Sequence, residues 1–101
     1  MAYYLQLAVL TDEGRKKFEE NPEWINEVNK DIELMGAKIL VQYGLLGEYD
    51  FVNIIETPSD EAAAKISIKL AAKGELRPKT LAAIPLKSLI ESLKKERRQA
   101  W

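Results

Sequence analysis

The chain has 101 residues, of which 47% are hydrophobic and 31% are charged, and its 15 basic and 16 acidic side chains leave a net charge of −1. This composition suits one folded domain and provides no excess positive charge to attract nucleic acid or an anionic membrane. Cysteine and histidine are both absent, which excludes disulfides, thiolate nucleophiles, histidine-dependent catalysis and the commonest metal sites. We therefore expect no metal and no cofactor.

Two further features of the sequence concern its compartment. No apolar run approaches the ~20 residues that a membrane-spanning helix needs. The first residues carry neither the basic segment nor the cleavage site of a signal peptide. We therefore expect a cytoplasmic protein without a membrane partner.

The first part of the chain predicts a strand followed by an interrupted helix. Residues 3–10 (YYLQLAVL) are apolar and rich in strand formers. Thr11 and the acids after it favour a helix start. Asn21-Pro22 interrupts this helix and restarts it, with Asn21 as the cap and Pro22 at the first helical position, and Gly36 is predicted to end it in the left-handed conformation. The restarted helix has an apolar stripe formed by Trp24, Ile25, Val28, Ile32 and Met35.

The second part predicts a hairpin, a helix, a strand and a last helix. Residues 37–46 and 49–57 are strand-like, and their short link indicates an antiparallel hairpin. Ser59 and Asp60 favour a second helix that Gly74 ends. Residues 76–84 form a fourth strand, which Pro78 marks either as an edge strand or as one that starts late. Pro85 opens an amphipathic helix whose apolar stripe is Leu86, Leu89, Ile90 and Leu93.

This order predicts an α+β, ferredoxin-like βαββαβ fold, in which helices cover one face of a four-stranded antiparallel sheet and a C-terminal helix is added. We divide the chain into a domain at residues 1–84 and a C-terminal amphipathic helix extension at residues 85–101. The basic cluster Lys94, Lys95, Arg97 and Arg98 complements the dipole of that last helix. Trp101, the final residue, is expected to be disordered or docked on a neighbouring subunit.

Apolar residues fall on both faces of the predicted sheet. In the first strand, Tyr3, Leu5, Leu7 and Val9 alternate with Tyr4, Gln6, Ala8 and Leu10. In the second strand, the same alternation places Ile39, Val41 and Tyr43 together. A sheet with one solvated face should instead alternate apolar with polar residues. We therefore expect a second copy to cover the open face, which gives a homodimer or larger homo-oligomer. The alternative is that the C-terminal helix folds back over this face.

The middle of the chain carries a short signature, Gly47-Glu48-Tyr49-Asp50, after a tyrosine-bearing strand. Other matching stretches are Thr11-Asp12-x-Gly14, Pro58-Ser59-Asp60-Glu61-Ala62-Ala63 and a Leu-Arg-x-Lys-Thr-Leu run at 76–81. Together they resemble the GYD-domain family, which takes its name from this signature, over Tyr3 to about Ile84. The resemblance implies a ferredoxin-like fold of the dimeric α+β barrel type, and it implies no particular activity.

The signature also suggests a candidate acid/base site. Glu48 and Asp50 are two residues apart, so they would share one face of a strand, and paired carboxylates can act as acid and base. Tyr43 and Tyr49 could donate protons or bind an oxyanion. However, acids beside glycine in a hairpin usually bind backbone amides or stay solvated. We favour this structural interpretation, in which Asp50 bonds a neighbouring amide or a cationic residue of the fourth strand (Arg77, Lys79).

Two binding hypotheses remain. The run Tyr49-Asp50-Phe51-Val52 is similar to an RNA-binding strand of RRM domains, but Glu48 and Asp50 would repel phosphate, so no nucleic-acid partner is expected. A small-molecule cavity beside the sheet is the other hypothesis, lined by Tyr3, Gln6, Tyr43, Tyr49 and Phe51 with Asp50 and Glu48 nearby. The alternative is that the aromatics only pack in the core or an interface.

The sequence thus favours a homo-oligomeric small-molecule-binding or assembly module over an enzyme. The alternative is a small enzyme that uses Asp50 and Tyr49, with Glu48, as its acid/base groups.

Overall fold

The computed structural model describes residues 1–99, which form four strands and four helices. In chain order these are β1 (Ala2–Leu10), α1 (Asp12–Glu20), α2 (Trp24–Leu34), β2 (Lys38–Gly44), β3 (Phe51–Thr57), α3 (Asp60–Ala72), β4 (Leu76–Ala83) and α4 (Leu86–Gln99). None of the helices in this part of the chain is long and apolar enough to cross a membrane.

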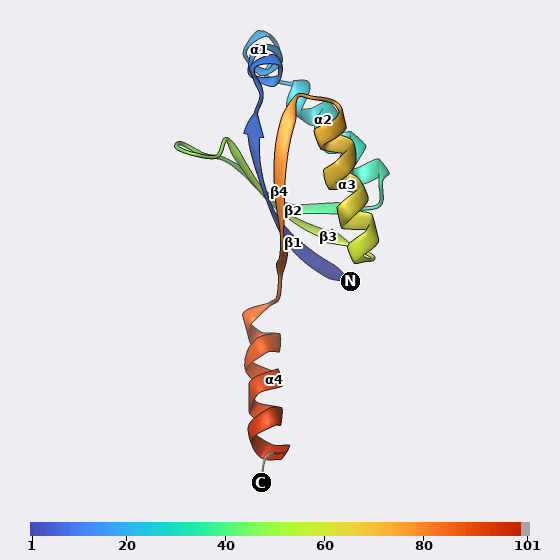
Figure 1. Ribbon diagram of the computed structural model, residues 1–101, viewed down its shortest axis with the longest axis vertical. Coiled ribbons are helices and arrows are strands. Elements are labelled where there is room, and N and C mark those ends of the chain that lie inside the picture. The colour runs from blue at the N-terminus through green and yellow to red at the C-terminus, as the bar shows by residue number, and fades with distance from the viewer. Residues whose placement is uncertain (100–101) are drawn as a thin grey trace.

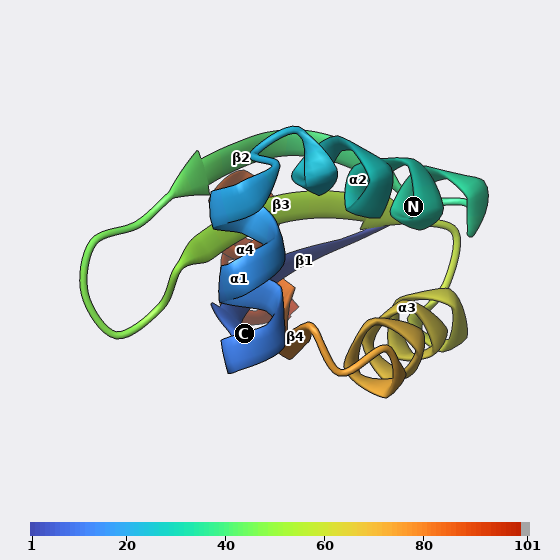
Figure 2. The same cartoon turned by 90° about the horizontal axis from the view of Figure 1, so that it is seen from above.

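The strands form one antiparallel sheet in the order β2-β3-β1-β4. In Figure 1, α2 and α3 lie on the same side of this sheet, α1 sits at one end, and α4 extends away from the opposite end. Figure 2 shows α2 near β2 and α3 near β4. The predicted α+β ferredoxin-like fold is therefore confirmed. Pro78 lies in β4, an edge strand, as expected for a residue without an amide hydrogen.

Local signals in the sequence set most helix ends. The Thr11 side chain accepts a hydrogen bond from the Gly14 amide, and Ser59 does the same for the Ala62 amide, so both predicted N-caps are confirmed. Two glycines after helices have positive φ, 95° at Gly36 and 77° at Gly74. The restart after Asn21-Pro22 differs from the prediction, because α2 begins at Trp24 and its N-cap, Glu23, makes no capping side-chain bond.

The core lies between the sheet and its helices. Alternate residues of β1 and β3 are buried, and they include Tyr4, Ala8, Leu10, Phe51 and Ile55. The helices contribute Trp24, Val28 and Ile32 from α2, and Ala63, Ile66 and Leu70 from α3. The predicted α2 stripe thus faces the sheet, although Ile25 and Met35 are only partly buried.

Strand β2 departs from the simple alternation that the sequence predicts. Its register against β3 shifts between Ile39 and Val41, so that Ile39 pairs with Ile55 and Val41 pairs with Ile54. The shift means that β2 has one extra residue between Ile39 and Val41. Such a bulge moves every later residue of the strand to the opposite face of the sheet. Ile39 therefore packs against the core, while Val41 and Tyr43 lie on the open face. The grouping of Ile39 with Val41 and Tyr43 on one face was wrong.

The C-terminal helix does not cover the open face of the sheet. Figure 1 shows α4 continuing beyond β4 along the long axis of the molecule, which measures 61 × 28 × 19 Å. Its apolar side chains Leu86, Leu89, Ile90 and Leu93 are all exposed. The alternative in which this helix folds back over the sheet is therefore not what the chain adopts. Trp101 lies outside the described residues.

Candidate functional site: the open sheet face and the β2–β3 loop

The Gly47-Glu48-Tyr49-Asp50 signature lies in a loop between two strands. The last residue pair of the β2–β3 ladder is Gly44 with Phe51, so residues 45–50 form the connection. The predicted strands ran further, to residue 46 and from residue 49. Gly47 has a φ of 125°, a conformation that L side chains rarely adopt, so the prediction that Gly47 permits the turn is confirmed.

Asp50 joins this loop to β1 by two hydrogen bonds and closes it by a third. Its carboxylate Oδ2 accepts from the Leu10 amide at 2.7 Å. Its own amide donates to the Ala8 carbonyl at 2.9 Å, and its carbonyl accepts from the Leu45 amide at 2.8 Å. The interpretation that Asp50 bonds a neighbouring amide is therefore confirmed. Its side chain holds the end of β1 beside the start of β3.

The other polar members of the signature do not converge on Asp50's carboxylate. Glu48 is exposed at the loop tip, near a fully exposed Leu46, and Tyr49 is half-buried before β3 begins. Glu48 thus stays in solvent while the Asp50 carboxylate is bound to a backbone amide, and these are the usual roles of acids beside glycine in a hairpin. The arrangement stabilises a loop, and a small molecule bound beside Tyr43, Tyr49 and Asp50 stays a prediction.

The open face of the sheet carries two rows of paired side chains that cross all four strands. One row is Val41, Ile54, Leu5 and Leu81, and the other is Tyr43, Val52, Leu7 and Lys79. Residues that pair across an antiparallel sheet share a face and touch. Tyr3 lies on the same face between Glu56 and Ala83. The face is thus mostly apolar, with charges toward its margins.

Gln6 lies on the opposite face, under the helices, and is only 1% exposed. It belongs to a row of amide side chains, which Asn29, Gln42 and Asn53 complete. Asn29 and Gln42 exchange two hydrogen bonds of 2.9 Å, Gln42 donates to Asn53 at 2.9 Å, and Asn53 donates to Gln6 Oε1 at 3.2 Å. Gln6 Nε2 is buried without a partner among the described residues.

The sheet itself separates the predicted site residues. Tyr3 and Tyr43 lie on the open face and Gln6 lies beneath the helices, so one cavity cannot be lined by all three. Phe51 is also on the helix side, where its ring packs edge-on against Phe18 with centroids 5.4 Å apart. The amide row was not predicted from the sequence. Its signal in the sequence was the presence of polar residues, such as Gln42 and Asn53, at strand positions that face the helices.

A second polar contact lies where β1 meets α3. The Tyr4 hydroxyl donates to Asp60 Oδ1, and this bond together with burial raises the pKa of Tyr4. These two residues line a groove between α3 and β4 with Ser67 and Thr80, whose hydroxyls lie 2.6 Å apart. A tyrosine with a raised pKa holds its proton more firmly, so it is not an activated base.

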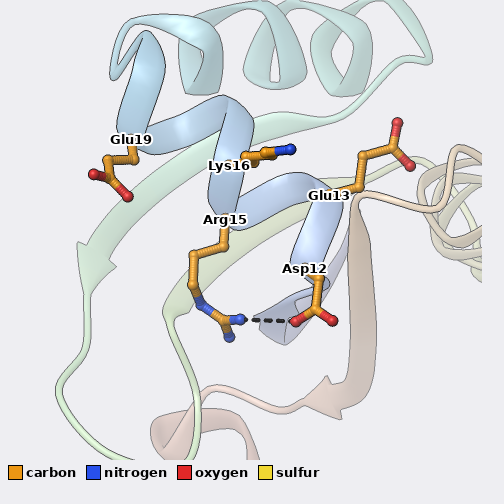
Figure 3. A pocket seen from close by; sticks show the side chains of 5 residues that line it. All are labelled: Asp12, Glu13, Arg15, Lys16 and Glu19. Carbon is orange, nitrogen blue, oxygen red and sulfur yellow. Dashed lines mark hydrogen bonds and ion pairs between the residues drawn. The ribbon is translucent and has the colours of Figure 1, made fainter.

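A hollow of about 530 Å³ on the surface of α1 is lined by Asp12, Glu13, Arg15, Lys16 and Glu19. Figure 3 shows these five side chains. Arg15 pairs with Asp12 at 3.2 Å. The remaining side chains in Figure 3 point in different directions rather than toward a common centre. All five residues are exposed, and ion pairs between exposed side chains contribute little energy.

Comparison with known proteins gives a family and a relative that matches nearly the whole chain. The family model described as GYD domain matches residues 4–93. The match extends beyond Ile84, where the resemblance in the sequence ends, into the first part of α4. A protein of Thermus thermophilus, named glutamine synthetase and cystathionine beta-lyase binding protein, is 40% identical over 95 residues, which cover 93% of this chain and 100% of the relative.

Solved structures share the fold at low sequence identity. The protein FFRP-DM1 is 21% identical with a TM-score of 0.58, and the match covers 83% of this chain and 100% of that one. The protein MtbAldR is 16% identical with a TM-score of 0.62, and the match covers 83% of this chain. This chain spans about half of MtbAldR, 52% of its length. At these sequence identities, the similarity shows a shared fold and nothing about function.

Proposed function

The chain belongs to the GYD domain family, and we propose that it is a homo-oligomeric protein-binding module that assembles through the open face of its sheet. The observation that carries this proposal is the pair of mostly apolar rows, which cross all four strands without a covering helix. Uncovered apolar surface that extends over a whole sheet face is typical of an interface. A second copy is a natural occupant, since two such faces pack together as in a sandwich.

The relative from Thermus thermophilus supports the protein-binding part. Its name states that it binds glutamine synthetase and cystathionine beta-lyase, and its whole length aligns with this chain. We propose the same kind of role here, in which the oligomer presents its outer surfaces to enzyme partners. An oligomer offers each such surface more than once, which raises the avidity for a multisubunit partner.

The chemistry of the chain agrees better with binding than with catalysis. The sequence has no histidine and no cysteine, and these are the usual general base and the strongest nucleophile at neutral pH. Asp50 is bound to a backbone amide. The alternative enzyme with Asp50, Tyr49 and Glu48 therefore has little support.

The assembly is tested by placing a charge at the centre of the open face. Ile54 pairs with both Leu5 and Val41, so Ile54→Glu would bury an unpaired carboxylate in the interface, which costs several kcal/mol. We expect light scattering to show an oligomer for the unchanged chain and a folded monomer for Ile54→Glu. The matched control is Ile68→Glu on α3, which replaces an exposed isoleucine outside the sheet and should leave the oligomer intact.

The partner role is tested separately with purified glutamine synthetase and cystathionine beta-lyase from the organism that encodes this chain. Calorimetric titration should detect binding to at least one of them. A chain that stays monomeric at every concentration would refute assembly through the sheet. Absence of heat with both enzymes would refute these two partners.

A further inference from the structure

We propose that α4 pairs in parallel with the α4 helix of a second copy, as a short two-helix coiled coil at one end of the sheet dimer. This inference rests on the proposed function, because the sheet dimer places the two α4 helices at the same end of the assembly. It assigns an interaction surface to the segment that follows β4.

The first argument is that α4 exposes an apolar stripe that nothing in the described part of its own chain covers. Leu86 is 68% exposed and Leu93 is 53% exposed, and Leu89 and Ile90 are also exposed. The helix has 14 residues, and isolated helices shorter than about 12–15 residues are marginal in water. Such a helix gains its stability from packing the stripe against a partner.

The second argument is the identity of the residues in the stripe. Leu86, Ile90, Leu93 and Arg97 follow the alternating steps of four and three that define a coiled-coil seam. In this frame Ile90 occupies an a position and the two leucines occupy d positions, a combination that favours two strands when a coiled coil is parallel. Arg97 occupies the next a position, and a single polar residue in a seam fixes register.

The third argument is the charge on each side of the seam. Lys87 and Lys94 lie on one flank, and Leu89 and Glu96 lie on the other. An antiparallel pair would place the lysine flanks of the two helices against each other. A parallel pair places Lys94 beside Leu89 of the partner helix, where the lysine stem can cover the leucine and leave its charge in water.

The fourth argument is continuity with the open face of the sheet. Exposed apolar residues continue from Leu81 on the open face through Ile84 in the connection to Leu86 in α4. A two-fold axis that runs along the strands packs two sheets face to face and leaves both α4 helices at the same end. Each helix follows an edge strand, so the two helices pair by leaning toward the axis from the connection after β4. Figure 1 shows that this end is free of the other labelled elements of the chain.

The test uses single cysteines, because the sequence contains none of its own. In a parallel pair, residue 86 faces residue 86 and residue 93 faces residue 93. We therefore expect Leu86→Cys and Leu93→Cys each to form a disulfide-linked dimer under mild oxidation, seen on a non-reducing gel. The control Lys95→Cys lies on the side of the helix away from the seam and should give at least about ten-fold less product, because its effective concentration is low.

Three outcomes would overturn the inference or its basis. If neither single variant links to itself but a mixture of the two links, the helices are antiparallel and the inference is wrong. If no variant links while light scattering still shows an oligomer, α4 does not pair and the proposed function stands. If Leu86→Cys links equally well when combined with Ile54→Glu, α4 pairs without the sheet, and the sheet interface is the part that fails.

Discussion

The carboxylate of Asp50 accepts a hydrogen bond of 2.7 Å from the backbone amide of Leu10, and this contact defines the role of the signature loop. Leu10 is the last residue of β1, and β3 begins directly after Asp50. The aspartate therefore satisfies an amide at the point where the β1–β3 ladder ends. The signature is explained by the loop that it closes, because only glycine suits the positive φ at position 47 and Asp50 supplies the acceptor.

The first prediction concerns this bond. Asp50→Ala leaves the Leu10 amide without its acceptor, and hydrogen bonds to charged groups contribute about 1.5–3 kcal/mol. We expect the free energy of unfolding in urea to fall by that amount, and by less in Asp50→Asn, whose amide oxygen can still accept. Glu48→Ala, a change at the exposed neighbour, should stay within about 0.5 kcal/mol. Equal losses for Asp50→Ala and Glu48→Ala would contradict this account.

The second prediction concerns the approach of α1 to the turn before β4. A Cβ atom at Gly14 would lie 2.0 Å from the backbone carbonyl oxygen of Glu75. Alanine is better than glycine in a helix by about 1 kcal/mol, yet we expect Gly14→Ala to destabilise the protein by about 1–3 kcal/mol, because the backbone must move to accept the methyl group. Gly44→Ala is the control, since its Cβ meets nothing within 4 Å. Thermal melts should show a lower unfolding temperature for Gly14→Ala than for the unchanged chain, and no such fall for Gly44→Ala.

The third prediction concerns the buried amide row. Gln6→Leu leaves the Asn53 amide without its acceptor, and Asn53→Leu leaves both Gln6 and Gln42 short of a partner. Each single change should destabilise the protein by about 1–3 kcal/mol, the usual cost of an unsatisfied buried group. The double change should cost clearly less than the sum, because the second leucine removes a group that the first left unpaired. Additive losses in this cycle would mean that the two amides are not coupled.

Much of the fold could be predicted because its signals are local. Thr11, Ser59 and Gly74 set helix ends through groups within a few residues, and the alternation of β1 was read correctly. The register shift after Ile39 could not be predicted, because it depends on how β2 meets β3. The alternation of β1 places Tyr3 and Gln6 on opposite faces of the sheet, so a single ligand site that contains both residues conflicted with that pattern. The sequence allowed Asp50 to be either an acid/base group or a partner of a backbone amide. Only the distance between its carboxylate and the Leu10 amide distinguishes the two roles.

The last prediction is an alkaline limit to stability that depends on Tyr4. Its hydrogen bond to Asp60, together with burial, raises the pKa of Tyr4 in the folded state. Below about pH 10, the usual pKa of tyrosine, both the folded and the unfolded chain keep the proton and the full contribution of the bond is present. Above that pH the unfolded chain releases the proton first, so the free energy of unfolding falls as the pH rises toward the folded-state pKa.

Tyr4→Phe lacks the phenol hydroxyl, so its free energy of unfolding should be lower at neutral pH but should decline less steeply above pH 10. Urea unfolding at a series of pH values measures both effects. The matched variant Asp60→Asn keeps the Tyr4 phenol but removes the carboxylate that raises its pKa, so its decline above pH 10 should also be shallower. Parallel curves for the unchanged chain and Tyr4→Phe above pH 10 would show that the contact with Asp60 does not shift the titration of Tyr4.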